Sequence, residues 1–196
     1  CCGWQTALLP EPALRDAIRP LRGQGSLFDS DTVPDAVHCG ARTLIPDGDR
    51  LYSGASFNPN DSDLAPRAAD DDANRQAIHA RHPDANPRLH SHYIGIRGAS
   101  RDYMPLLGAI PDARDVAEKY AALRRDAGIH IARDIAHHPR HYIHQGLGSK
   151  GCTQVWLNAD ILAAILNDTP IPLPQPQLER LTPARYLLRA LKRGQL

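Results

Sequence analysis

A glycine-rich stretch between a predicted strand and a predicted helix is the part of this sequence best suited to hold a ligand. It reads His144-Gln145-Gly146-Leu147-Gly148-Ser149-Lys150-Gly151, and residues 140–144 favour a short strand. The apolar residues that follow recur at helical spacing: Val155, Trp156, Leu157, Ile161, Leu162 and Ile165. Glycine lets the backbone approach a ligand closely, and the first N–H groups of a helix lack internal partners and carry partial positive charge. The stretch therefore predicts a site for an anionic or electron-rich group, although an ordinary tight connection has the same pattern.

The second candidate is Arg97, at the end of a strand predicted over residues 88–97. A guanidinium presents a planar fork that can hold a carboxylate by two hydrogen bonds. The alternative is a surface arginine in a salt bridge. Arg101 lies nearby and is less specific, and Asp102 is suited to cap the turn.

The histidines do not predict a metal site. His90 and His92 are expected to share one face of their strand, but no third ligand follows from the spacing, and metal sites usually need one. No third ligand follows from the spacing for His137-His138, or for His141 with His144, either. The glycine stretch is not a phosphate-binding GxxxxGK[ST] loop either.

The elements that position these residues follow from periodicity and from turn residues. Strands joined by short turns predict an antiparallel sheet over residues 21–28, 36–39, 42–45, 51–57 and 88–97, with Asp47-Gly48 as a hairpin turn. Asp61 or Asp63 is expected to cap a following helix. Helices are predicted over residues 13–18, 68–81, 111–126 and 183–192, and residues 129–140 and 170–176 are expected to be irregular or extended.

Composition limits the class of protein. The 196 residues are 42% hydrophobic and carry a formal net charge of +1, so bulk charge does not indicate a nucleic-acid binder. Cys1, Cys2, Cys39 and Cys152 show no CxxC spacing and are interpreted as reduced thiols of a cytoplasmic protein. We find no apolar run long enough to span a membrane and no signal-peptide pattern.

The C-terminal helix carries a basic stripe. Its cations are Arg185, Arg189, Lys192 and Arg193, with Arg180 just before them. Such a stripe can follow the phosphates of a nucleic acid. It is also the usual solvated face of an amphipathic helix.

Several motifs resemble one enzyme family. The run from Gly146 to Gly151 resembles the last flavin-contacting loop of the D-amino-acid-oxidase-like FAD enzymes. More narrowly, it resembles the oxidoreductase part of the bifunctional bacterial enzymes that make 5-methylaminomethyl-2-thiouridine in tRNA. Residues 94–108 and 181–189 resemble that family in the same order, with Lys150 where the family usually has arginine. Lysine cannot replace a bidentate arginine contact.

The resemblance implies an α/β fold that is the C-terminal part of a two-domain FAD enzyme. Residues 1–12 would end a strand of the FAD domain, residues 13–97 would form a substrate domain with an antiparallel sheet, and residues 98–196 would return to the FAD domain. Because the chain opens in Cys1-Cys2-Gly3-Trp4, which resembles the end of a buried strand, we expect it to have lost an N-terminal part. An FAD enzyme of this type places a GxGxxG fingerprint on its first strand and helix, and the N-terminal part of this sequence has none, so we expect this chain alone not to hold FAD tightly.

The resemblance also implies residue roles. Gly146, Leu147, Gly148, Ser149, Lys150 and Gly151 would contact FAD. Arg97 would be the catalytic arginine that holds the substrate carboxylate, with Arg101 as a further substrate-binding residue.

The implied reaction is the FAD-dependent oxidation of carboxymethylaminomethyl-uridine at the tRNA wobble position to aminomethyl-uridine, with release of glyoxylate. The implied partners are tRNA and a methyltransferase domain of the same polypeptide, which uses S-adenosylmethionine. Two alternatives stay open: an oxidase of a free amino acid such as glycine or sarcosine, and a truncated, non-catalytic fragment.

Overall fold

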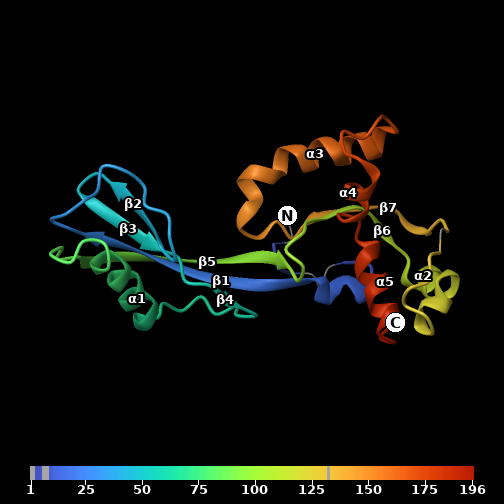
Figure 1. Cartoon of the computed structure of the whole chain (residues 1–196), viewed down its shortest axis with the longest axis horizontal. Helices are drawn as coiled ribbons and strands as arrows, with labels where there is room; N and C mark the ends of the chain where they lie inside the picture. Colours follow the sequence, from blue (N-terminus) through green and yellow to red (C-terminus); the bar gives the residue numbers. More distant parts are fainter. Residues whose placement is uncertain (1–2, 6–8, 132) are drawn as a thin grey trace. The chain divides into compact units, whose positions relative to one another are not determined.

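The computed structural model describes residues 3–5, 9–131 and 133–196, so Cys1 and Cys2 lie outside the described residues. The chain divides into two compact units (Figure 1). Residues 20–97 form one, here called the sheet unit, and residues 1–19 with 98–196 form the other, here called the helical unit. The expected substrate domain began at residue 13. Residues 13–19 instead belong to the helical unit, because Leu14, Ala17 and Ile18 pack in one core with Leu106 and Ile110.

The sheet unit is built on an antiparallel sheet. Its strands are β1 (Ile18–Asp29), β2 (Thr43–Asp47), β3 (Arg50–Gly54), β4 (Asn58–Pro59) and β5 (Arg88–Ser100). They follow the order β2-β3-β1-β4, with β5 also paired to β1. The β2–β3 hairpin closes where Asp47 pairs with Arg50, and Gly48 has φ +63° in the turn. The antiparallel sheet and its hairpin are therefore as predicted, but residues 36–39 make only an isolated bridge between His38 and Leu44.

Helix α1 (Ala68–His79) covers one face of this sheet (Figure 1). The contact is partly apolar, through a buried cluster of Phe28, Leu44, Leu51, Ile78 and Ala85. It is also strongly polar. The Oδ1 of Asp71 accepts hydrogen bonds from Gln24 Nε2 at 2.8 Å and Ser26 Oγ at 2.6 Å. These bonds satisfy buried polar groups and fix the position of the helix on β1.

The predicted caps of α1 are wrong. Its N-cap is Arg67, with no side-chain capping bond. Asp61 and Asp63 instead form ion pairs with the Arg67 guanidinium, with nitrogen–oxygen distances of 2.6 and 3.0 Å. Both aspartates precede the helix by several residues, and the N–H groups that they accept belong to the loop before it: Asp63 N–H to Asp61 and Ala65 N–H to Asp63.

The helical unit surrounds a two-stranded antiparallel ladder of β6 (Leu106–Pro111) and β7 (His137–Gln145). Its helices are η2 (Pro12–Ala17), α2 (Ala113–Lys119), η3 (Ala121–Arg124), η4 (Gly148–Lys150), α3 (Gly151–Asn167), α4 (Gln175–Glu179) and α5 (Ala184–Lys192). Strand β6 was not predicted, and the helix predicted over residues 111–126 is divided at Tyr120. The stretch predicted as extended over 170–176 leads into α4, which begins at Gln175.

Candidate functional site

The glycine stretch forms a strand-to-helix connection, as the sequence predicts. Strand β7 ends at Gln145, the short helix η4 spans Gly148–Lys150, and α3 begins at Gly151. Gly146 and Gly148 have φ +76° and +55°, the left-handed region that favours glycine. A Cβ atom at Gly146 would lie 2.8 Å from Ile18 Cδ1, so that position also lacks space for a side chain.

The glycine stretch lies beside the end of β5. Ala99 forms an antiparallel bridge with Leu147, and the Ser100 N–H donates to the Gly146 carbonyl at 3.5 Å. Arg97 precedes Ala99 by two residues in the same strand and is the last residue of the sheet unit. Its side chain is exposed, and within the described ranges the structure gives it no hydrogen bond or ion pair. The residues that contact the glycine loop, Ala99 and Ser100, thus follow Arg97 closely in the sequence.

The start of α3 is open to a ligand. Its N-cap, Lys150, makes no side-chain capping bond, so no side chain satisfies the first N–H groups of the helix in this way. A Cβ atom at Gly151 would meet no other atom within 4 Å. On the preceding strand, burial lowers the pKa of His144, so its imidazole is neutral at pH 7. The loop can thus accept an electron-rich group from the side of α3 without displacing a capping side chain.

Asp102 has a different role from the predicted turn cap. Its Oδ1 does accept the Met104 N–H at 3.2 Å, but the carboxylate chiefly binds α5. Arg185 donates to both of its oxygens, at 2.9 and 3.0 Å, while Arg189 donates at 2.5 Å and the Tyr186 hydroxyl at 2.8 Å. Burial by itself would raise the pKa of Asp102, but the hydrogen bonds from Arg185, Arg189 and Tyr186 outweigh it and hold that pKa well below its usual range.

Arg185 is buried and holds the fold together, so the predicted basic stripe offers one cation fewer to a ligand than the sequence suggests. It is only 7% exposed, and it also donates to the carbonyls of Leu181, Thr182 and Met104. A guanidinium has five N–H donors, and these bonds together with the two to Asp102 use them all. Arg185 therefore has no donor left for a phosphate, whereas Arg189 is 49% exposed.

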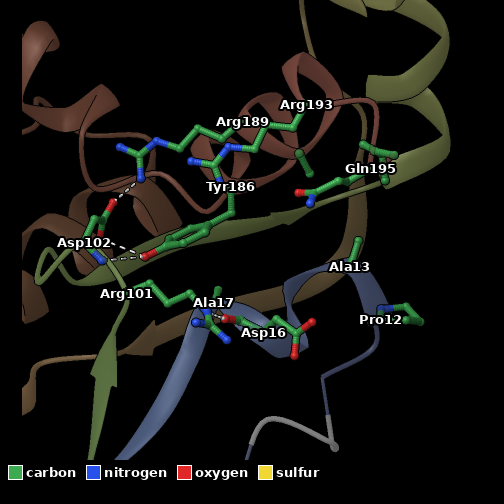
Figure 2. A pocket seen from close by; sticks show the side chains of 12 residues that line it. Pro12, Ala13, Asp16, Ala17, Arg101, Asp102, Tyr186, Arg189, Arg193 and Gln195 are labelled. Atoms are coloured by element: carbon green, nitrogen blue, oxygen red, sulfur yellow. Dashed lines mark hydrogen bonds and ion pairs between the residues drawn. The ribbon is translucent and has the colours of Figure 1, made fainter. Parts of the chain in front are cut away.

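Arg101 lies at the edge of a pocket on the helical unit. Its Nε donates to the Asp16 carbonyl at 2.5 Å, and its backbone N–H donates to the Ala17 carbonyl at 3.1 Å. The pocket has a volume of about 760 Å³ and is also lined by Arg189 and Arg193 (Figure 2). Sequence reasoning did not find this pocket, because its walls come from η2, from the loop after β5 and from α5.

Residues 1–165 match the family described as FAD dependent oxidoreductase. The chain belongs to this family. It is 38% identical over 196 residues to the tRNA 5-methylaminomethyl-2-thiouridine biosynthesis bifunctional protein MnmC of Dichelobacter nodosus, covering 98% of this chain and 32% of that protein. The protein of the same name from Pseudomonas aeruginosa is 35% identical over 201 residues, covering 94% and 30%. The chain thus spans about a third of the length of these relatives.

Solved structures show the same fold as this FAD-dependent oxidoreductase. Iminodiacetate oxidase from Chelativorans sp. BNC1 matches with a TM-score of 0.63 and 22% identity, over 92% of this chain and 44% of that chain. Glycine oxidase from Geobacillus kaustophilus matches with a TM-score of 0.57 and 15% identity, over 82% and 38%. The predicted α/β fold of a D-amino-acid-oxidase-like FAD enzyme is therefore confirmed.

Two histidines of this FAD-dependent oxidoreductase, His90 and His92, each lie near an aspartate. His92 Nδ1 lies 3.5 Å from Asp71 Oδ2, and His90 Nδ1 lies 3.4 Å from Asp29 Oδ1. Among the described residues no group of at least three histidine, cysteine or acidic side chains could hold a metal ion. Cys39 and Cys152 are free and exposed. A search of the described residues found no helix long and apolar enough to cross a membrane.

Two alanine substitutions in the glycine loop should have clearly different effects on stability. Gly146→Ala places a side chain at positive φ and against Ile18, so we expect about 2 kcal/mol of destabilisation. Gly151→Ala adds a methyl group to open space at a helical φ of −52°, so we expect it to be neutral or to stabilise by up to about 0.5 kcal/mol. Thermal unfolding of the two variants measures the difference, and equal destabilisation would contradict the prediction.

Proposed function

We propose that this chain forms the C-terminal part of an FAD-dependent enzyme that oxidises the carboxymethylaminomethyl group of wobble uridine in tRNA to aminomethyl, releasing glyoxylate. The observation that carries the proposal is the bridge between Ala99 and Leu147. It joins the segment following Arg97 to a glycine loop suited to an electron-rich cofactor. The relatives named for tRNA 5-methylaminomethyl-2-thiouridine biosynthesis supply the substrate class.

The glycine loop is the part of the chain proposed to hold FAD. Its residues are Gly146, Leu147, Gly148, Ser149, Lys150 and Gly151. Positive φ at Gly146 and Gly148 turns the chain into α3, and the open space at Gly151 leaves the helix N–H groups accessible. These N–H groups would stabilise negative charge that develops against them during oxidation. Lys150 would add a point charge without the fork of an arginine.

Arg97 is proposed to hold the substrate carboxylate, and Arg101 to bind a more distant part of the substrate. A bidentate guanidinium fixes the carboxylate and thereby orients the adjacent C–H bond, which is a positioning effect. When bound, FAD supplies the oxidation by accepting a hydride from that carbon and passing the electrons to oxygen as hydrogen peroxide. The substrate imine that results is hydrolysed by water to glyoxylate and aminomethyl-uridine.

Each of the two units is proposed to form part of a different domain of the enzyme. The sheet unit is proposed as the substrate domain and the helical unit as part of the FAD domain. A methyltransferase domain of the same polypeptide, using S-adenosylmethionine, would methylate the amine that this reaction produces. Because tRNA is the substrate, we place the enzyme in the cytoplasm.

Hydrogen peroxide release by the full-length protein tests the proposal. We expect peroxide with tRNA that carries the carboxymethylaminomethyl group, and none with the same tRNA lacking it. Glyoxylate should form in equal amount. Peroxide with free glycine or sarcosine instead of tRNA would assign the chain to an amino-acid oxidase. A protein without bound flavin and without peroxide release on any of these substrates would be the non-catalytic alternative.

A further inference from the structure

We propose that the pocket lined by Arg101, Arg189 and Arg193 binds phosphate groups of an RNA backbone, an inference that rests on tRNA being the substrate of the proposed function. The pocket lies within the helical unit and has a volume of about 760 Å³. Figure 2 shows Arg189 and Arg193 extending from α5, while Arg101 comes from the loop after β5. No residue of the glycine loop is among the described residues that line this pocket, so it would be a second binding site.

These guanidinium groups keep donors free for a ligand. Within the described part of the chain, Arg101 uses only its Nε, on the Asp16 carbonyl, and Arg189 uses only Nη1, on Asp102. The structure gives the Arg193 side chain no hydrogen bond or ion pair to any described residue. Guanidinium forks match the oxygen atoms of phosphate and hold them by paired hydrogen bonds.

The acidic residues of the pocket do not cancel this charge. Asp102 is already bound by Arg185, Arg189 and Tyr186, and its lowered pKa keeps it a charged acceptor committed to these partners. Asp16 is the other carboxylate among the residues that line the pocket. Three guanidinium groups and two carboxylates thus line the pocket, and one of these carboxylates, Asp102, is also paired with buried Arg185 outside the lining. The main-chain oxygen of Leu196, which also borders the pocket, accepts from Arg124 and from no pocket arginine.

The arrangement fits a polyanion better than a single small anion. Arg189 lies in the last turn of α5 and Arg193 is its C-cap, so the two are separated by about 6 Å along the helix axis. Asp102 holds Arg189 in place, and both Arg189 and Arg185 lie over the Tyr186 ring, at 5.6 and 4.7 Å from its centroid. Several cations in a pocket larger than one phosphate can contact successive backbone groups without reading bases.

Binding of unmodified, fluorescently labelled tRNA to the full-length protein tests the pocket without using the oxidation reaction. We compare Arg101→Gln/Arg193→Gln with Arg114→Gln/Arg125→Gln, which removes the same charge from exposed arginines of the same unit that lie outside the pocket. The pocket variant should raise Kd about tenfold at 100 mM salt and lower the slope of log Kd against log salt by about 1.5 to 2. The control variant should change Kd by less than about twofold.

Three other results would overturn the inference. If both double variants weaken tRNA binding equally, the effect comes from overall charge and not from the pocket. If the unaltered protein does not bind tRNA, RNA is not the ligand of the pocket. Displacement of tRNA by millimolar inorganic phosphate, at constant ionic strength, would assign the pocket to free phosphate. If the pocket variant loses tRNA binding while the unaltered protein releases no peroxide with modified tRNA, that result would support the phosphate-binding pocket and reject the proposed oxidation.

Discussion

Replacing Arg97 by alanine should lower kcat/KM for the proposed tRNA substrate by about 10²- to 10³-fold, because truncating one partner of a hydrogen-bonded charge pair costs about 3–4 kcal/mol. The loss should appear in KM, since the carboxylate loses its partner. It should also appear in kcat, because the C–H bond is no longer held in the reactive orientation. Steady-state peroxide release measures both constants.

Conservative and matched variants make this prediction specific. Arg97→Lys keeps the charge but not the fork, so it should recover only a part of the activity. Arg88→Gln alters an exposed arginine at the start of the same strand, β5, and should leave both constants within about twofold of normal. An Arg97→Ala enzyme with normal constants would show that this arginine does not touch the substrate. Unchanged flavin content in all variants is required for the comparison.

Replacing Asp102 by asparagine should destabilise the protein by about 3 kcal/mol, because a buried guanidinium loses its charge partner. Arg185 is 7% exposed and pairs with both oxygens of Asp102, whose own side chain is 20% exposed. For a domain of this size we expect the melting temperature to fall by about 6–12 °C. Asp134→Asn, an exposed position of the same unit, is the matched control and should shift it by less than about 2 °C.

A second substitution shows whether the loss comes from the unpaired charge. In Asp102→Asn/Arg185→Met the buried cation is also removed, so the double variant should be more stable than the sum of the two single effects predicts. Additive effects would indicate that Asp102 and Arg185 stabilise the protein independently.

The same carboxylate gives the stability of the protein a pH dependence. The pKa of Asp102 is lower in the folded protein than the ordinary value of 3.8. Its ionised form therefore stabilises the fold above that ordinary value, and the contribution is lost as pH falls through the lower folded value. The stability difference between the normal protein and Asp102→Asn should thus be constant above about pH 5 and shrink toward pH 2. Urea unfolding across this range measures it.

The local elements at the glycine loop and at the hairpin turn were predictable from the sequence. Glycines between a strand pattern and a helix pattern place the turn at residues 146–151, and the structure has η4 and α3 there. Asp47-Gly48 likewise marks the hairpin between β2 and β3. Such features depend on φ preferences and on periodicity, which each short segment carries within itself.

Other features needed the tertiary structure, because their partners are far apart in the chain. Asp102 and Arg185 are separated by 83 residues, so the sequence shows one as a turn residue and the other as part of a basic stripe. Along α3 the apolar spacing does not tell that Ile161 is buried while Trp156 is 76% exposed. The sequence by itself determined the glycine loop, the antiparallel sheet and the resemblance to FAD oxidases. Only packing decided which arginines are buried against a carboxylate and which remain free in a pocket, because burial and charge pairing arise between segments that periodicity cannot connect.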